Sequence, residues 1–261
     1  MKLQKFSLTD QEFADYLNAS RICGDIATTR ANNIAHMHGF IEGNEHLEFG
    51  VKWTRDWNFE EVFELMAQRV GTQPDVDFLE GQDSISAEKC IAALYRYAEI
   101  FGETVRKGGK ILFATGHPAG LFPIYCELAR YAGDAGAEIL SIEEGDKFLD
   151  GEIRQILDVI MFEQYGNLQH THYPAPMELS LQQLKSRGII PDLVVADHGM
   201  AGFAASAHIP TIGIADCNDP GLFVSEAQGQ IKVAVPMDDN VNPHLYRPVT
   251  EFILTKAALL W

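Results

Sequence analysis

The chain has 261 residues, 46% of them hydrophobic, which suits one large α/β domain or such a domain with a helical addition. Its 37 acidic residues outnumber 20 Lys and Arg residues, giving a formal net charge of −17. This charge repels nucleic acids and anionic membranes, so both are excluded as expected partners. The four cysteines are scattered, no signal-peptide pattern is visible, and no apolar run could span a bilayer. We therefore expect a cytoplasmic protein.

The first part of the chain, residues 1–109, is expected to be a helical region packed on the rest of the molecule. Apolar residues recur at helical spacing and predict helices over residues 7–35, 58–71 and 84–109. The intervening segment 36–57 is harder to place, and it fits a loop with one short strand.

From Lys110 onward, apolar runs alternate with amphipathic segments, which predicts alternating strands and helices. The predicted strands cover residues 110–116, 138–142, 192–197, 211–216 and 231–236. The predicted helices cover residues 121–137, 152–166, 201–208 and 221–229. Each strand is apolar along its length, as in a parallel sheet covered on both faces. The expected fold is therefore α/β, with a doubly wound, mostly parallel, Rossmann-like sheet over residues 110–261, forming one compact unit with the N-terminal helices.

Polar groups follow the predicted strands, at the end where open parallel sheets bind their ligands. If the fold is as expected, these strand ends converge in space. They read ATGHPAG (114–120), SIEEGD (141–146), VADHGMAG (195–202), IADCNDPG (214–221) and VAVPMDDN (233–240).

The turn TGHPAG suits an anion such as a phosphate. Gly116 and Gly120 permit tight backbone geometry, and the following helix N-terminus offers free N–H groups. Thr115 would supply a hydroxyl and His117 a proton donor. The motif matches neither G-x-G-x-x-G nor a Walker A sequence, so nucleotide binding is unsupported. The alternative is a simple strand–helix turn whose histidine caps or packs.

Asp197 and His198 stand side by side where a buried strand is expected to end. The carboxylate could bind a metal, orient a histidine or act as a base, and the imidazole suits proton transfer or metal ligation. The alternative is that Asp197 caps the following helix and His198 is exposed.

The segment ADCNDPG brings Asp216, Asn218 and Asp219 within four residues, an oxygen-rich set that suits Mg²⁺ or Mn²⁺. Turn and cap chemistry explains NDPG equally well. Cys217 is expected to be a packed thiol. Two histidine pairs are weaker candidates for binding a metal or a phosphate, His36 with His38 and His170 with His172, although neutral loop histidines are the commoner outcome. Arg30 and Arg55 are candidates for binding an anion, but surface placement is slightly preferred for both.

Several phrases of the second half resemble one group of bacterial proteins, frequent in actinobacteria and usually labelled phosphatases. They are FATGHPAGL, VVADHGMAG, IADCNDPGLFVSEAQG and VPMDDNVNPHLYRP. No D-x-D-x stands near a predicted strand end, no C-x5-R forms a predicted loop, and no R-H-G motif occurs. The resemblance therefore implies phosphatase activity by another mechanism. It points to Thr115, Gly116, His117, Asp197, His198, Asp216, Asn218 and Asp219.

The leading hypothesis is a metal-assisted phosphomonoester hydrolase acting on a small phosphorylated metabolite. Its metal ligands would be Asp197, Asp216 and Asp219, and its catalytic residues His117, Asp197 and His198. Substrate would contact Thr115, Gly116, Gly120 and Asn218. One alternative is a phosphosugar sensor without turnover. The other is a sugar-phosphate isomerase or lyase in which Glu143 and Glu144 matter. Homodimerisation is left open.

Overall fold

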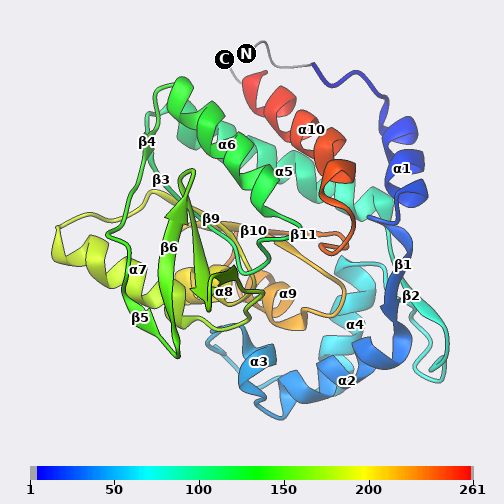
Figure 1. Cartoon of the computed structure of the whole chain (residues 1–261). Helices are drawn as coiled ribbons and strands as arrows, with labels where there is room; N and C mark the ends of the chain where they lie inside the picture. Colours follow the sequence, from blue (N-terminus) through cyan, green and yellow to red (C-terminus); the bar gives the residue numbers. More distant parts are fainter. Residues whose placement is uncertain (1–4, 260–261) are drawn as a thin grey trace.

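A mixed, mostly parallel β-sheet lies at the centre of the structure, a computed structural model that describes residues 5–259 (Figure 1). Its strands follow the order β11-β10-β9-β3-β7-β6-β5, with β4 pairing with β3 and β8 pairing with β7. Strands β11, β10, β9, β3 and β7 run parallel, and β6, β5 and β8 add antiparallel pairs. The bounds are β3 (Lys110–Ala114), β4 (Glu138–Ile139), β5 (Lys147–Phe148), β6 (Gly151–Ile156), β7 (Val159–Gln164), β8 (Asn167–Leu168), β9 (Leu193–Asp197), β10 (Thr211–Ala215) and β11 (Val233–Pro236).

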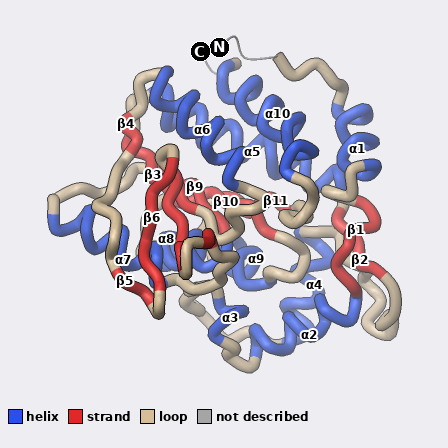
Figure 2. Tube along the Cα trace, in the orientation of Figure 1, coloured by secondary structure: helices blue, strands red, loops and turns tan. Residues whose placement is uncertain are grey.

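Helices cover both faces of this sheet, which explains why β9, β10 and β11 are buried along their whole length. One face carries α5 (Ala87–Arg106), α6 (Phe122–Asp134) and α10 (Arg247–Ala258), the last preceded by the 3-10 helix η1 (Pro243–Tyr246). The other carries α7 (Ala175–Ser186), α8 (His198–Ser206) and α9 (Pro220–Ala227). Figure 2 shows these two helical layers in blue around the red strands. The predicted α/β fold with a mostly parallel sheet is confirmed.

The N-terminal region is less helical than predicted. A two-stranded antiparallel sheet, β1 (Gly24–Thr29) with β2 (Gln82–Ile85), accompanies helices α1 (Asp10–Ala19), α2 (Arg30–Ile41), α3 (Glu45–Glu48) and α4 (Phe59–Arg69). The single helix expected over residues 7–35 is therefore wrong. Arg21, directly after the C-cap residue Ser20, has a left-handed φ of 60° and ends the first helix. Gly24, with φ of 73°, begins strand β1. In the segment 36–57, α2 and α3 occupy residues expected to form a loop with a strand.

The helix predicted over residues 152–166 is also wrong, because the segment forms the β6–β7 hairpin. Leu157 and Asp158 make its two-residue turn, and both have positive φ, at 46° and 69°, as a type I′ turn requires. The segment is rich in β-branched residues, and its apolar spacing fits either structure. Pairing with β3 and β6 decides in favour of strands.

The predicted division of the chain at residue 109 stays a prediction. Helix α5, which falls in the first part, packs against β10 and β11 of the sheet, and α1 packs on α5. One hydrophobic core cluster takes members from both sides of residue 109. Among the described residues, none of the helices has the length and apolar character needed to cross a membrane.

Candidate functional site

Four loops meet at the carboxyl ends of β3, β9, β10 and β11, as the strand order allows. Within residues 5–259, two sets of side chains converge there closely enough to hold a metal ion, and both contain His198. Together these residues form the site cluster: His170, His172, His198, Asp219 and Asp239. Glu143 and Glu144 are not members of it. Glu144 is exposed and accepts a hydrogen bond from the backbone N–H of Gln155.

His198 is held in place at the junction of β9 and α8. Its backbone φ is 46°, a left-handed conformation that costs a non-glycine residue on the order of 1–3 kcal/mol. Its Nδ1 donates to Asp197 Oδ1 at 2.6 Å, and the backbone N–H of Gly116 donates to the same oxygen at 2.7 Å. The carboxylate thus fixes the imidazole and ties the β3 loop to the β9 loop. His198 is 2% exposed, so the alternative of an exposed histidine is excluded.

The other ring nitrogen of His198 faces two buried acids. Its Nε2 lies 3.4 Å from Asp239 Oδ2 and 3.8 Å from Asp219 Oδ2. The Oδ2 atom of Asp239 is buried and makes no hydrogen bond within the protein. A buried carboxylate oxygen without a partner carries a desolvation cost, which a bound cation would remove.

Burial disfavours the charged forms of these acids and raises their pKa values. It raises the pKa of Asp239 well above its usual range, and the pKa of Asp219 is raised for the same first reason. Burial, then the neighbouring charges of Asp238 and Asp219, raises the pKa of Asp216 to about 8. For His198, burial lowers the pKa, but Asp219, Asp197 and Asp239 outweigh it and raise the value to about 10. Without a cation, this cluster is stabilised by retained protons.

His170 and His172 join the cluster from the segment between β8 and α7. The Nε2 of His170 lies 3.3 Å from Nε2 of His198 and 3.1 Å from Nε2 of His172. The Nδ1 of His172 donates to the backbone carbonyl of His46 at 2.8 Å. The two members of the other predicted pair, His36 and His38, have different partners. His36 hydrogen-bonds through Nδ1 to the carbonyl of Asn218 at 2.8 Å, whereas His38 is exposed and stacks on Phe59.

The TGHPAG turn lies at the site, but its N–H groups are largely engaged. Gly116 donates to Asp197, His117 donates to Thr115 Oγ1 at 2.9 Å, and Gly120 donates to His117 Nδ1 at 3.1 Å. A Cβ on Gly116 would lie 2.3 Å from the carbonyl of Thr171, and one on Gly120 would lie 2.1 Å from the carbonyl of Asp239. These glycines are needed for close packing of loops. Substrate binding by the turn stays a prediction.

The acceptor role of His117 Nδ1 decides which nitrogen carries the ring proton. A backbone N–H can only donate, so Nδ1 of His117 has the lone pair and a neutral ring has its proton on Nε2. Burial and the nearby His198 lower the pKa of His117, which favours this neutral form. Its Nε2 lies 3.9 Å from Asp239 Oδ1. The proton therefore faces the site.

The remaining predicted residues lie near the site with other partners. Asp216 accepts from the N–H of Cys217 at 2.7 Å and from the hydroxyl of Thr28 at 3.1 Å, and it belongs to neither metal-competent set. Asn218 donates to Asn32 Oδ1 at 3.2 Å. Cys217 is a buried thiol whose pKa is raised first by burial, as expected for a packed cysteine. As metal ligands, Asp197 and Asp216 stay predictions.

Neither predicted arginine belongs to the site cluster. Arg30 is fully buried and pairs with buried Asp83 at 2.8 Å, so its expected surface position is wrong. Arg55 is exposed, and it pairs with Glu61 and lies over the ring of Trp57.

In the sequence, Asp239 is one residue of the polar strand end VAVPMDDN, and no spacing rule distinguishes it from its neighbours. Its position after an apolar strand was the one available signal.

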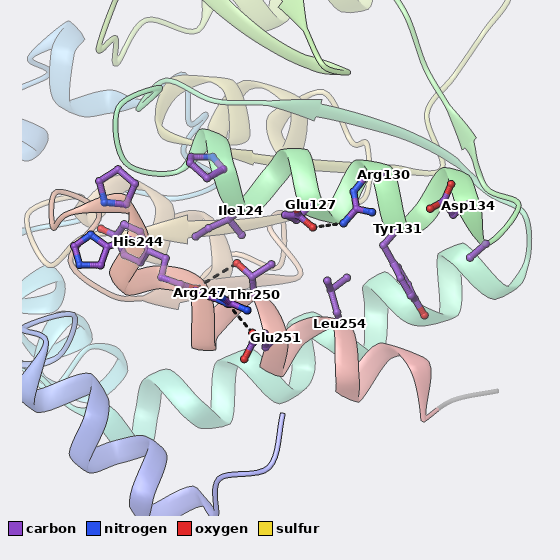
Figure 3. A pocket seen from close by; sticks show the side chains of 14 residues that line it. Ile124, Glu127, Arg130, Tyr131, Asp134, His244, Arg247, Thr250, Glu251 and Leu254 are labelled. Atoms are coloured by element: carbon purple, nitrogen blue, oxygen red, sulfur yellow. Dashed lines mark hydrogen bonds and ion pairs between the residues drawn. The ribbon is translucent and has the colours of Figure 1, made fainter. Parts of the chain in front are cut away.

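A cavity of about 610 Å³ opens beside the site cluster, with His170 and His172 in its wall. No Lys, Arg, Asp or Glu lines it, and its other lining residues are Ala35, His36, Gly39, Asn44, His46, Leu47, Leu149, Phe162, Gln164, Gln169, Thr171 and Tyr173. A larger cavity of about 860 Å³ lies between α6 and α10 and shares no residue with the site cluster (Figure 3). Among its charged lining residues, Glu127 pairs with Arg130 and Arg247 pairs with Glu251.

Comparison with known proteins agrees with the resemblance noted in the sequence. A family model described as Phosphatase matches residues 8–260. A Streptomyces coelicolor protein named Phosphatase SCO2771 is 42% identical over 251 residues, which cover 95% of this chain and 96% of that protein. Both matches span nearly the whole molecule, and the family model includes every loop of the site. The chain therefore belongs to the Phosphatase family.

Proposed function

We propose that the protein is a metal-dependent phosphomonoester hydrolase acting on a small phosphorylated metabolite. The observation that carries this proposal is the convergence of His198 Nε2 with one oxygen each of Asp219 and Asp239, all buried. Family membership supports a hydrolase, since the matched relative is named a phosphatase.

The residues present fit a divalent cation. His198 has its Nδ1 proton tied to Asp197, so a cation that displaces the proton on Nε2 finds a lone pair there. Hydrogen bonding of this kind is usual behind metal-binding histidines. Asp239 Oδ2 has no other partner in the protein. A bound cation would polarise the phosphoryl group and promote attack by water.

The contacts support distinct roles for the neighbouring side chains. Asp197 holds His198 in orientation, which suits a positioning residue better than a direct ligand. His117 presents its Nε2 proton toward the site and is placed to protonate the leaving oxygen. The TGHPAG turn acts first as a scaffold, because its N–H groups already donate within the protein.

Two features support a small substrate bound at this edge of the sheet. The adjoining cavity of about 610 Å³ falls within the size range of small-molecule sites. The parallel strands continue on one side of β3 through β9, β10 and β11 and on the other through β7, which supports the doubly wound, Rossmann-like interpretation. In such sheets ligands bind where the strand order reverses, here between β3 and β9.

The test is hydrolysis of a generic phosphate ester by the purified chain, with divalent metal and after chelation. We expect chelation and Asp239→Asn each to lower kcat/KM by about 100-fold or more, because loss of several kcal/mol of transition-state stabilisation has this effect. Asp134→Asn, at an exposed acid in α6, is the control and should keep full activity. Activity indifferent to chelator and to Asp239→Asn would reject the mechanism. Ligand binding without product would instead support a sensor.

A further inference from the structure

The site cluster contains two further histidines, His170 and His172, that have no role in the proposed reaction. The Nε2 atoms of His170, His172 and His198 lie in a chain with separations of 3.1 and 3.3 Å. His170 and His172 come from the segment after β8, and His198 begins α8 directly after β9, so the fold brings them together at the sheet edge.

The hydrogen bonds of two of these rings show where their lone pairs point. The Nδ1 of His172 faces a backbone carbonyl and the Nδ1 of His198 faces a carboxylate, and both partners accept. Each Nδ1 therefore carries a proton, and in the neutral rings Nε2 is the lone-pair atom. In the neutral rings, both lone pairs are directed toward His170 Nε2. Nitrogen lone pairs at this separation repel one another unless a proton or a cation lies among them.

The separations match those of ligands around one ion. With metal–nitrogen bonds of about 2.1 Å, neighbouring ligand atoms in tetrahedral or octahedral geometry lie roughly 3.0–3.4 Å apart. The Nε2 of His198 has one lone pair and can bind one ion at a time. The three histidines, whose ligand atoms all lie within 4.8 Å of one another, are therefore best served by a shared ion.

We infer, building on the proposed function, that His170 and His172 bind the same ion as His198 and make the site selective for a transition metal such as Zn²⁺ over Mg²⁺. Imidazole ligands suit Zn²⁺ and its neighbours, whereas Mg²⁺ prefers oxygen ligands and keeps its water. Because His170 and His172 also line the adjoining cavity, the ion would be reachable from the side where a substrate fits. Three protein ligands with an open position are typical of catalytic zinc sites.

The experiment measures binding of the metal alone to the chelator-treated full chain, by isothermal titration and elemental analysis. We expect one Zn²⁺ per chain, bound at least about 100-fold more tightly than Mg²⁺. His170→Ala and His172→Ala should each weaken Zn²⁺ binding by more than the roughly 10–100-fold that loss of an outer-shell partner costs. Their Mg²⁺ binding should not change. With Co²⁺ as a probe, the visible absorption of the bound ion should shift in both variants.

His38→Ala is the matched control, because this exposed histidine of α2 lies outside the site cluster. It should bind Zn²⁺ as the unaltered chain does. Circular dichroism of His170→Gln and His172→Gln without metal shows whether each variant is folded. Weaker Zn²⁺ binding by a folded variant is then due to loss of the ligand. Tighter binding of Mg²⁺ than Zn²⁺, or unchanged Zn²⁺ binding in both alanine variants, would overturn the inference. In that case, phosphatase activity with Mg²⁺ would still support the proposed function. Zinc binding without hydrolysis would support the inference and reject only the proposed function.

Discussion

At the residue scale, Asp197 shows how one buried carboxylate can organise a site. Its Oδ1 accepts from Gly116 and from His198, and this oxygen therefore links two strand ends. Although burial opposes ionisation, the hydrogen bond and charge of His198 lower the pKa of Asp197. The charged form is therefore the one that holds the imidazole in place.

Asp197→Asn should keep the fold but reduce activity. The amide oxygen can still accept both hydrogen bonds, whereas the negative charge that supports His198 is lost. We expect kcat/KM to fall by about 10–100-fold, the usual effect of removing an outer-shell partner of a metal-binding histidine. Steady-state kinetics and circular dichroism check this. Full activity in the asparagine variant would show that the charge of Asp197 has no part in the reaction.

At the scale of elements, two-residue turns determine the antiparallel part of the sheet. The β6–β7 turn places Leu157 in the left-handed region, with φ of 46°, and leaves its side chain 70% exposed. The β7–β8 turn uses Tyr165 and Gly166, with φ of 55° and 79°. Both geometries match the right-handed twist of a hairpin.

Leu157→Asn should stabilise the protein. Asparagine tolerates the left-handed conformation better than leucine, and a left-handed backbone costs an ordinary residue about 1–2 kcal/mol. We expect the free energy of unfolding to rise by about 1 kcal/mol, measured by thermal or urea denaturation. Ile190→Asn, at another exposed apolar residue whose φ is not positive, should bring no such gain. Equal effects of the two substitutions would mean that surface polarity, not backbone geometry, is responsible.

At the scale of the whole molecule, the excess of acids bears on how an anionic substrate can bind. The chain has a formal charge of −17, and five aspartates surround the site: Asp197, Asp216, Asp219, Asp238 and Asp239. A phosphate would be repelled by these acids unless a cation were bound first.

Inorganic phosphate should therefore bind only in the presence of divalent metal. With metal, phosphate at 100 times its Kd should raise the free energy of unfolding by about 2.7 kcal/mol, visible as a higher melting temperature. After chelation, phosphate should give no more than the shift produced by sodium chloride at equal ionic strength. An equal phosphate shift with and without metal would show that protein groups alone bind the anion.

The sequence could predict the second half of the fold because its strands are short apolar runs bounded by glycine, proline and acidic residues. It could not separate helix from hairpin over residues 152–166, where the apolar spacing fits both periods. Only pairing with β3 and β6 decides that choice. In the N-terminal region, β1 and β2 pair across more than fifty residues, a contact without a local signal.

For the site, the sequence by itself determined that acids and histidines stand at strand ends, because the strand–turn order is local. From that order the sequence predicts His117, Asp197, His198 and Asp219 as site residues, together with Asp216, which belongs to neither metal-competent set of the described residues. Only the tertiary structure decided which atoms meet. It turned Asp197 toward Nδ1 of His198 and brought Asp239, His170 and His172 to its Nε2 side. The physical reason is that side-chain direction depends on hydrogen bonds and packing between loops distant in sequence.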